Sequence, residues 1–152
     1  MANHCTNDVN ITHTDPAKIH MLEWALEQDK LFETFVGTCP SDMDWHEWAD
    51  KYIGCSRLYD WEMFSVEDNE IQFGLTTGWH PPSVFYKILE RLHGYKVEAR
   101  YYENGNCIVG TYENGELDHY EWDHDWTAEQ IKKEIPEDLI EYAGMLDEVE
   151  WI

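Results

Sequence analysis

Apolar and polar residues alternate along residues 70–76, and this period-two pattern predicts a half-buried strand. Gly78 allows a bend after the strand, and Pro81-Pro82 ends strand pairing while being tolerated in the first turn of a helix. Apolar residues recur at helical spacing over 85–92, and Gly94 follows where a left-handed C-terminal cap is expected. This stretch therefore predicts a strand, a sharp turn and a helix.

A three-stranded meander is predicted after that helix, with strands over 97–102, 106–113 and 116–122. The tripeptide Glu-Asn-Gly occurs twice, at 103–105 and 113–115, and separates these strands. Asn-Gly suits the two positive-φ positions of a type I′ turn. Both pairs are therefore predicted to be tight hairpin turns.

The N-terminal part predicts a short first strand over 5–12, followed by a helix. Asp15-Pro16 combines an N-cap with proline at the first helical position, and the apolar spacing continues to about Phe32. Residues 41–54 carry aromatic residues at helical spacing behind Asp42 or Asp44, either of which is a suitable cap. They predict an inserted helix or a structured loop.

Alternation over 57–67 predicts another strand, with Leu58 and Trp61 on opposite faces. After the meander, residues 127–130 form a capping-box pattern that opens a C-terminal helix. Pro136 interrupts this helix, and a last amphipathic piece follows.

The element order predicts an α+β fold built on one antiparallel sheet of five or six strands. With the insertion set aside, the first six elements read β-α-β-β-α-β, the ferredoxin-like order, with both helices on one face of the sheet. The extra C-terminal β-hairpin strand pair would extend the sheet at one edge or fold over it. A single domain over 1–152 is expected, with a core at about 3–122, an insertion at 38–54 and an acidic, helical C-terminal extension at 123–152.

Three stretches resemble a known family: Tyr59-Asp60-Trp61, the run from Phe73 to Pro82, and the hairpin from Tyr101-Tyr102-Glu103 to Tyr112-Glu113-Asn114-Gly115. With the loop at Cys39-Pro40, they resemble the YubB ferredoxin-like domain family of phages and plasmids over about residues 3–120. The chain departs from the family at Gly78 and His80, where alanine and serine are usual, and at Glu62, where aspartate is usual. The resemblance implies this fold and an origin in a mobile element. It transfers no catalytic residue, because the family is not tied to an established activity.

Composition excludes several classes of protein. The chain begins at Met1-Ala2 without a basic-apolar leader, and no apolar run approaches the length of a membrane span, so a cytoplasmic location in the host cell is expected. The four cysteines form no close pair, which favours reduced, buried thiols over a disulfide or a zinc knuckle.

Charge is the strongest compositional signal, since 32 acidic residues face 10 basic ones for a net charge of −22. Residues 81–112 are nearly neutral, whereas residues 113–152 hold 14 acidic and 2 basic residues. Such a chain repels nucleic acid and anionic membranes. A base-stacking sheet that uses Tyr101, Tyr112 and Tyr120 is disfavoured for the same reason.

Catalytic motifs are missing from the sequence, which has neither a nucleophile elbow nor a glycine-rich phosphate loop, so no enzyme activity and no cofactor are expected. Trp79 is expected to pack the sheet against the following helix, and its truncation to be strongly destabilising. The alternative function is a divalent-metal-binding protein or small enzyme built on the cluster from Asp118 to Asp125, with Asp118, His119, Asp123 and His124 as ligands.

The favoured function is that of a non-enzymatic, acidic phage protein that binds a basic host protein, as a nucleic-acid mimic that inhibits a host defence or nucleic-acid enzyme. Carboxylates would steer the partner and aromatic side chains would anchor it. The expected contact residues are Glu113, Glu116, Asp118, Glu121, Trp122, Asp123, Asp125 and Trp126, with Tyr142 and Trp151 as further anchors. The competing interpretation is that the charge only maintains solubility.

Overall fold

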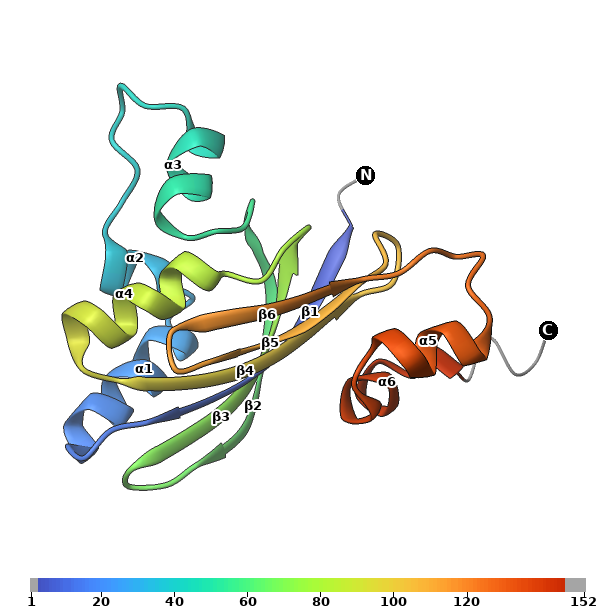
Figure 1. Cartoon of the computed structure of the whole chain (residues 1–152). Coiled ribbons are helices and arrows are strands. Elements are labelled where there is room, and N and C mark those ends of the chain that lie inside the picture. The colour runs from blue at the N-terminus through green and yellow to red at the C-terminus, as the bar shows by residue number, and fades with distance from the viewer. Residues whose placement is uncertain (1–2, 147–152) are drawn as a thin grey trace.

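One antiparallel sheet organises the protein, and the computed structural model describes residues 3–146 of it (Figure 1). Within those residues the six strands lie in the order β2-β3-β1-β4-β5-β6. The strands are β1 (His4–Thr12), β2 (Leu58–Val66), β3 (Glu70–Gly78), β4 (Lys96–Glu103), β5 (Ile108–Glu113) and β6 (Glu116–Glu121). The helices are α1 (Pro16–Glu27), α2 (Leu31–Val36), α3 (Trp45–Tyr52), α4 (Ser83–His93), α5 (Ala128–Glu134) and α6 (Glu137–Ala143). The predicted α+β class with one antiparallel sheet is confirmed, and of the five or six strands predicted the sheet has six.

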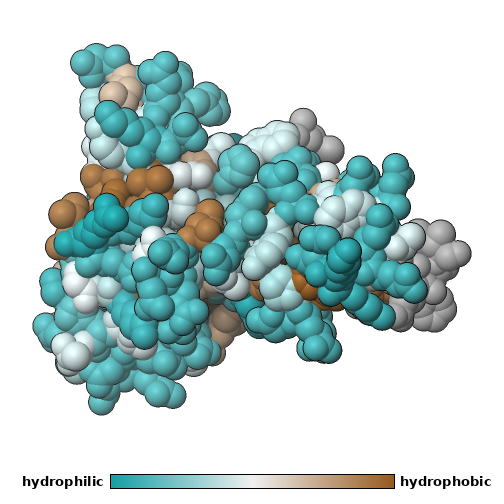
Figure 2. All heavy atoms as spheres, viewed as in Figure 1, coloured by the Kyte–Doolittle hydropathy of each residue, from teal (hydrophilic) through white to brown (hydrophobic). Residues whose placement is uncertain are grey.

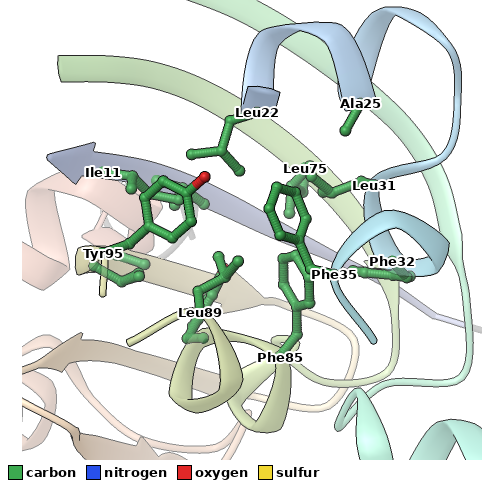
Figure 3. Close-up of a cluster of buried hydrophobic side chains, with 14 of the residues drawn as sticks. Ile11, Leu22, Ala25, Leu31, Phe32, Phe35, Leu75, Phe85, Leu89 and Tyr95 are labelled. Atoms are coloured by element: carbon green, nitrogen blue, oxygen red, sulfur yellow. The ribbon is translucent and has the colours of Figure 1, made fainter. Parts of the chain in front are cut away.

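The principal core lies between one face of the sheet and the helices α1, α2 and α4. Strands β1 and β3 bury every second residue on this face, as period-two patterning predicts. Figure 3 shows side chains from the strands and from these helices meeting there, with Phe85 of α4 close to Phe32 and Phe35 of α2. Residues Trp48 and Ala49 of α3 join the same cluster, which attaches the insertion to the domain.

The opposite face of the sheet is covered near β4 and β5 by α5 and α6. Val109 is fully buried there against Ile131, Ile135 and Leu139. The strand register sets Val109 opposite Tyr102 and Tyr120, so all three side chains share that face. Helices thus lie on both faces, and the C-terminal piece is two short helices (Figure 1). The two helices predicted to share one face, which are α1 and α4, do pack in one cluster, whereas the C-terminal extension covers the other face with its own apolar residues.

Local capping signals were predicted correctly. Asp15 accepts a hydrogen bond from the Ala17 backbone N–H ahead of α1, and Asp44 caps α3. Gly94 takes the left-handed conformation after α4, with φ 75°. Thr127 and Gln130 form the predicted capping box of α5. Each signal is contained within three or four consecutive residues.

Three local predictions were wrong. The first helix does not run on to Phe32: it ends at Glu27, since Asp29 adopts φ 56°, and α2 begins at Leu31. Leu58 and Trp61 lie on the same face of β2, because the register shifts between Leu58 and Asp60. The loop at Asn104–Gly105 is not a type I′ turn.

In that loop the left-handed residue is Cys107, with φ 57°. The carboxylate of Glu103 accepts hydrogen bonds from the backbone N–H groups of Gly105 and Asn106, which stabilises a longer connection. The second pair, Asn114 and Gly115, does adopt the predicted type I′ conformation, with φ 54° and 76°. The hairpin that it closes extends the sheet beyond β4.

The cysteines are all free, at Cys5, Cys39, Cys55 and Cys107. Burial raises the pKa of Cys5 and of Cys55 to about 12. Between residues 3 and 146, no helix is both long enough and apolar enough to cross a membrane.

Candidate functional site

The acidic segment, residues 113–125, includes the hairpin of β5 and β6 at one edge of the sheet. It contains six acidic residues and neither lysine nor arginine. The side chains of all six are exposed: Glu113, Glu116, Asp118, Glu121, Asp123 and Asp125. Figure 2 shows that hydrophilic residues cover most of the surface over this edge of the molecule.

Strand register separates these carboxylates into groups. Glu113 lies directly opposite Glu116, and Asp118 lies opposite Thr111, so these three carboxylates share one face of the hairpin. Glu121 lies opposite Ile108 and belongs to the other face. Three of the predicted contact residues are therefore brought together, and a fourth is turned away from them.

Asp123 and Asp125 lie beyond β6, in the connection to α5. The backbone N–H of Asp125 donates to the Asp123 carboxylate over 3.0 Å, so Asp123 shapes a local turn. In the part of the chain described, the only carboxylate of the acidic segment that forms an ion pair is Glu121, with His119 at 3.2 Å. The other carboxylates of the acidic segment can therefore bind a cationic group of another molecule.

The aromatic residues predicted as anchors lie partly against the protein itself. Trp122, Trp126 and Tyr142 are half-buried and pack around the cluster of α5 and α6. Tyr142 also stacks with the guanidinium of Arg100, which lies 4.1 Å from its ring centroid. Trp151 falls outside the described residues. These side chains stabilise the C-terminal helices on the sheet and offer a partner only their remaining exposed edges.

The two histidines of the acidic segment point toward different groups. Nδ1 of His119 lies 2.6 Å from the hydroxyl of Tyr101. Gly110 lies between these two residues in the sheet and has no side chain to separate them. Nε2 of His124 lies 3.1 Å from Sγ of Cys107. Within residues 3–146, no group of three or more His, Cys, Asp or Glu side chains is placed to hold a metal ion. Asp118, His119, Asp123 and His124 are thus not assembled as one ligand set.

The contact between Cys107 and His124 does not make an activated nucleophile. Burial, reinforced by the Asp123 and Glu103 carboxylates, raises the pKa of the Cys107 thiol. A thiol with a raised pKa stays protonated near neutral pH, whereas a nucleophilic cysteine needs its thiolate. Burial likewise raises the pKa of Tyr101 well above the usual range, so the hydroxyl next to His119 stays protonated too.

A second site, which the sequence did not predict, lies at the opposite edge of the sheet. We call it the aromatic pocket. It has a volume of about 730 Å³. Its lining comes from α3, from the chain that enters β2, from the start of β2 and from the chain that leaves β3, and includes Trp45, Tyr59 and Trp79. A volume of this size is typical of ligand sites.

Trp79 belongs to this pocket, so the expectation that it packs the sheet against α4 was wrong. Its side chain is 38% exposed, and its backbone has φ 68°. Because of this left-handed conformation, the ring does not continue the row of buried side chains on β3, a strand that ends at Gly78. In the sequence, Gly78 and Pro81-Pro82 indicate a sharp turn at Trp79. They do not indicate the direction in which the Trp79 ring points.

Comparison of the chain with protein-family models, with curated proteins and with solved structures finds no match. The resemblance to the YubB family therefore stays a prediction.

Proposed function

We propose that this protein is a non-enzymatic binding protein whose acidic segment binds a basic surface of a host protein. Carboxylates on an exposed hairpin attract a positively charged partner and set its orientation. The position of β6 at the sheet edge leaves one side of the hairpin accessible.

One observation carries this proposal, namely the direct opposition of Glu113 and Glu116 across the β5–β6 turn. Like charges placed opposite each other destabilise an antiparallel pair. A surface that serves only solubility needs acidic residues but does not need them paired in this way, and interspersed signs are more favourable. The repulsion would be relieved when a cationic side chain of a partner lies between the two carboxylates.

The proposed partner is a nucleic-acid-binding enzyme or complex of the host, which the acidic segment would occupy as a nucleic-acid mimic. Asp118 continues the line of charge beyond Glu116 on the same face of the hairpin, and such spacing supports mimicry of successive phosphates. The proposed setting is the cytoplasm of a cell that carries a phage or plasmid, in keeping with the resemblance to the YubB family. This setting follows from that resemblance and not from the site.

We also propose that the inner four strands with α1 and α4 form a ferredoxin-like core. The supporting observations are that β1 lies between β3 and β4, all antiparallel, and that α1 and α4 contribute to one cluster on one face. Strands β5 and β6 extend this arrangement beyond β4, so the order of the whole sheet differs from that of a plain four-stranded core.

The metal-binding or enzymatic alternative has less support. His119 and His124 have separate neighbours, and the thiol beside His124 has a raised pKa.

The test compares two triple variants of equal charge. The first, Glu113→Gln with Glu116→Gln and Asp118→Asn, neutralises the shared face of the hairpin. The matched control neutralises three exposed acids elsewhere in the chain, in Glu27→Gln, Glu67→Gln and Glu134→Gln. Each is used as bait in a host lysate at low and at physiological salt, with and without competing DNA. Both variants are expected to fold, since all six side chains are exposed.

A host protein held by the parent and by the control, lost with the hairpin variant and displaced by DNA, would support the proposal. Its retention should fall with salt, because the screening length drops to about 8 Å at physiological ionic strength. If the hairpin variant retains the same proteins as the control, the acidic hairpin is not the binding surface.

A further inference from the structure

The aromatic pocket is assembled from segments that the sequence keeps far apart. Trp45 stands at the start of α3, Tyr59 near the start of β2, and Trp79 just after β3. Gly78 makes this meeting possible, because a Cβ there would overlap the Ser56 side chain. In Figure 1, α3 lies at the end of the molecule where β2 begins and β3 ends. The insertion therefore supplies one wall of the pocket.

The backbone holds Trp79 in an unfavourable conformation. A bulky residue at φ 68° is a genuine outlier, and such strain persists only where neighbouring contacts impose it. The Trp79 N–H donates to the carbonyl of Asn3 over 2.9 Å, and the hydroxyl of Thr77 donates to the carbonyl of His80 over 2.7 Å. These bonds hold the turn, and the turn presents the indole to the pocket instead of to the core.

Aromatic surface is left exposed inside the pocket. Trp45 is 42% exposed, Tyr59 37% and Trp79 38%. The Trp45 indole is fixed, since Nε1 donates to the carbonyl of Ser56 over 3.1 Å and the ring packs beside Trp48. Tyr59 is fixed by stacking against His4, with ring centroids 4.3 Å apart. A fixed ring such as the Trp45 indole presents its exposed surface at little cost in side-chain entropy.

The charges of the pocket favour a cation. Glu47 and Asp50 line it, and neither forms an ion pair within residues 3–146. Arg57 is the fixed cation of the lining, and its guanidinium lies 5.2 Å from the centroid of the Tyr59 ring. No carboxylate of the described chain pairs with Arg57, so the ring face already serves as the partner of a positive charge there. The rings of Trp45 and Trp79 therefore remain for a further cation, together with the carboxylates of Glu47 and Asp50.

We propose that the aromatic pocket binds a basic side chain, lysine or arginine, presented by a peptide segment of a partner protein. The indole faces would receive the cation, and Glu47 and Asp50 would neutralise it. A volume of about 730 Å³ exceeds what one ammonium group fills, so the flanking peptide would occupy the remainder. The net charge of −22 disfavours an anionic occupant.

This site goes beyond the proposed function and does not depend on it. The pocket lies at the β2 edge of the sheet and the acidic hairpin at the β6 edge. Six strands at about 4.8 Å spacing set the two edges roughly 24 Å apart. Binding at each site can therefore be removed separately.

The test uses small probes and the indole N–H signals of the full chain. N-acetylarginine amide and N-acetyllysine amide are titrated while two-dimensional nitrogen–proton spectra are recorded. The neutral isostere N-acetylcitrulline amide serves as the control, and AMP tests the competing possibility of a nucleobase platform. The Trp45 and Trp79 signals are assigned with Trp→Phe variants. Saturable shifts of both signals with the cationic probes, and not with the isostere, are expected.

Variants then separate this site from the acidic hairpin. Glu47→Gln with Asp50→Asn is expected to weaken binding of the cationic probes. Trp79→Gly, which removes the ring and accepts the positive φ, should weaken it by about two- to fivefold, the range for an exposed cation–π contact. The hairpin variant Glu113→Gln with Glu116→Gln and Asp118→Asn should leave probe binding unchanged.

Two outcomes would overturn the proposal. Equal shifts with the charged probe and its neutral isostere, or no saturable shift with any probe, would show that the pocket does not select a cation. Tighter binding of AMP than of the cationic probes would make the aromatic pocket a base-stacking site instead. Neither outcome bears on the acidic hairpin, whose test uses host proteins.

Discussion

Replacing Glu116 by lysine is expected to stabilise the protein while abolishing partner binding. Glu116 faces Glu113 directly across the type I′ turn, so Glu116→Lys converts a repulsive cross-strand pair into an attractive one. The turn itself is left unchanged, because Asn114 and Gly115 keep their positive φ angles. Glu116 is exposed, and a lysine side chain extends into solvent there without steric conflict.

The size of the expected stabilisation follows from the cross-strand pair of Glu113 with residue 116. A cross-strand pair of opposite charges contributes roughly 0.2–1 kcal/mol, and directly opposed like charges are destabilising. The free energy of unfolding should therefore rise by on the order of 1 kcal/mol, which for a chain of this size corresponds to about 2–4 °C in Tm. Asp118→Lys is the matched control, because it changes the net charge equally but faces Thr111, so its gain should be smaller.

Thermal unfolding followed by circular dichroism measures both variants at low and at high salt. The difference between them should disappear near 1 M salt, where the screening length is about 3 Å. If Asp118→Lys stabilises the protein as much as Glu116→Lys, general charge reduction explains the gain and the opposed pair does not. A Glu116→Lys protein that is less stable than the parent at low salt would refute the assigned register.

Three further outcomes are expected. Gly110→Ala should lower the free energy of unfolding by roughly 1–3 kcal/mol in urea titrations, because the added methyl would overlap the Asp118 carbonyl oxygen and the Tyr101 hydroxyl; an unchanged midpoint would contradict this packing. Trp79→Gly should leave Tm unchanged or raise it, because it relieves a strained φ and removes no core contact. A fall in Tm of several degrees would indicate that Trp79 packs in the core. Burial, with a smaller effect of the Asp15 carboxylate, raises the pKa of Tyr95 from 10.0 to about 12. The folded state therefore favours the protonated phenol, and this preference stabilises the protein fully below pH 10. The stabilisation should be lost as the pH rises from 10 to about 12. Tyr95→Phe should flatten the dependence of Tm on pH in that window.

Features encoded by a few adjacent residues were predicted from the sequence. The caps at Asp15 and Thr127, the left-handed Gly94 and the turn at Asn114–Gly115 depend on side chains and φ angles within one turn of chain. The strand periodicity of residues 70–76 depends on one buried face, which the sequence displays directly. For such features the determining interactions are local, so no knowledge of the rest of the molecule was needed.

Predictions failed where two local solutions compete. Asn104–Gly105 has the same dipeptide as Asn114–Gly115, yet the Glu103 carboxylate binds the loop N–H groups and moves the left-handed position to Cys107. In β2 a register shift reversed the faces that strict alternation had predicted. In the loop a side-chain contact outweighed the dipeptide pattern, and in β2 an irregularity of the strand pairing interrupted the alternation.

The sequence by itself determined the fold class, a single antiparallel sheet of five or six strands and the concentration of acid in residues 113–125. Only the tertiary structure decided which carboxylates share a face, since that depends on the strand register between β5 and β6. Only the tertiary structure brought Trp45, Tyr59 and Trp79 to one pocket. The physical reason is that periodicity reports whether a face is buried, whereas the meeting of distant segments depends on chain reversals and on close approaches such as that of Gly78 to Ser56.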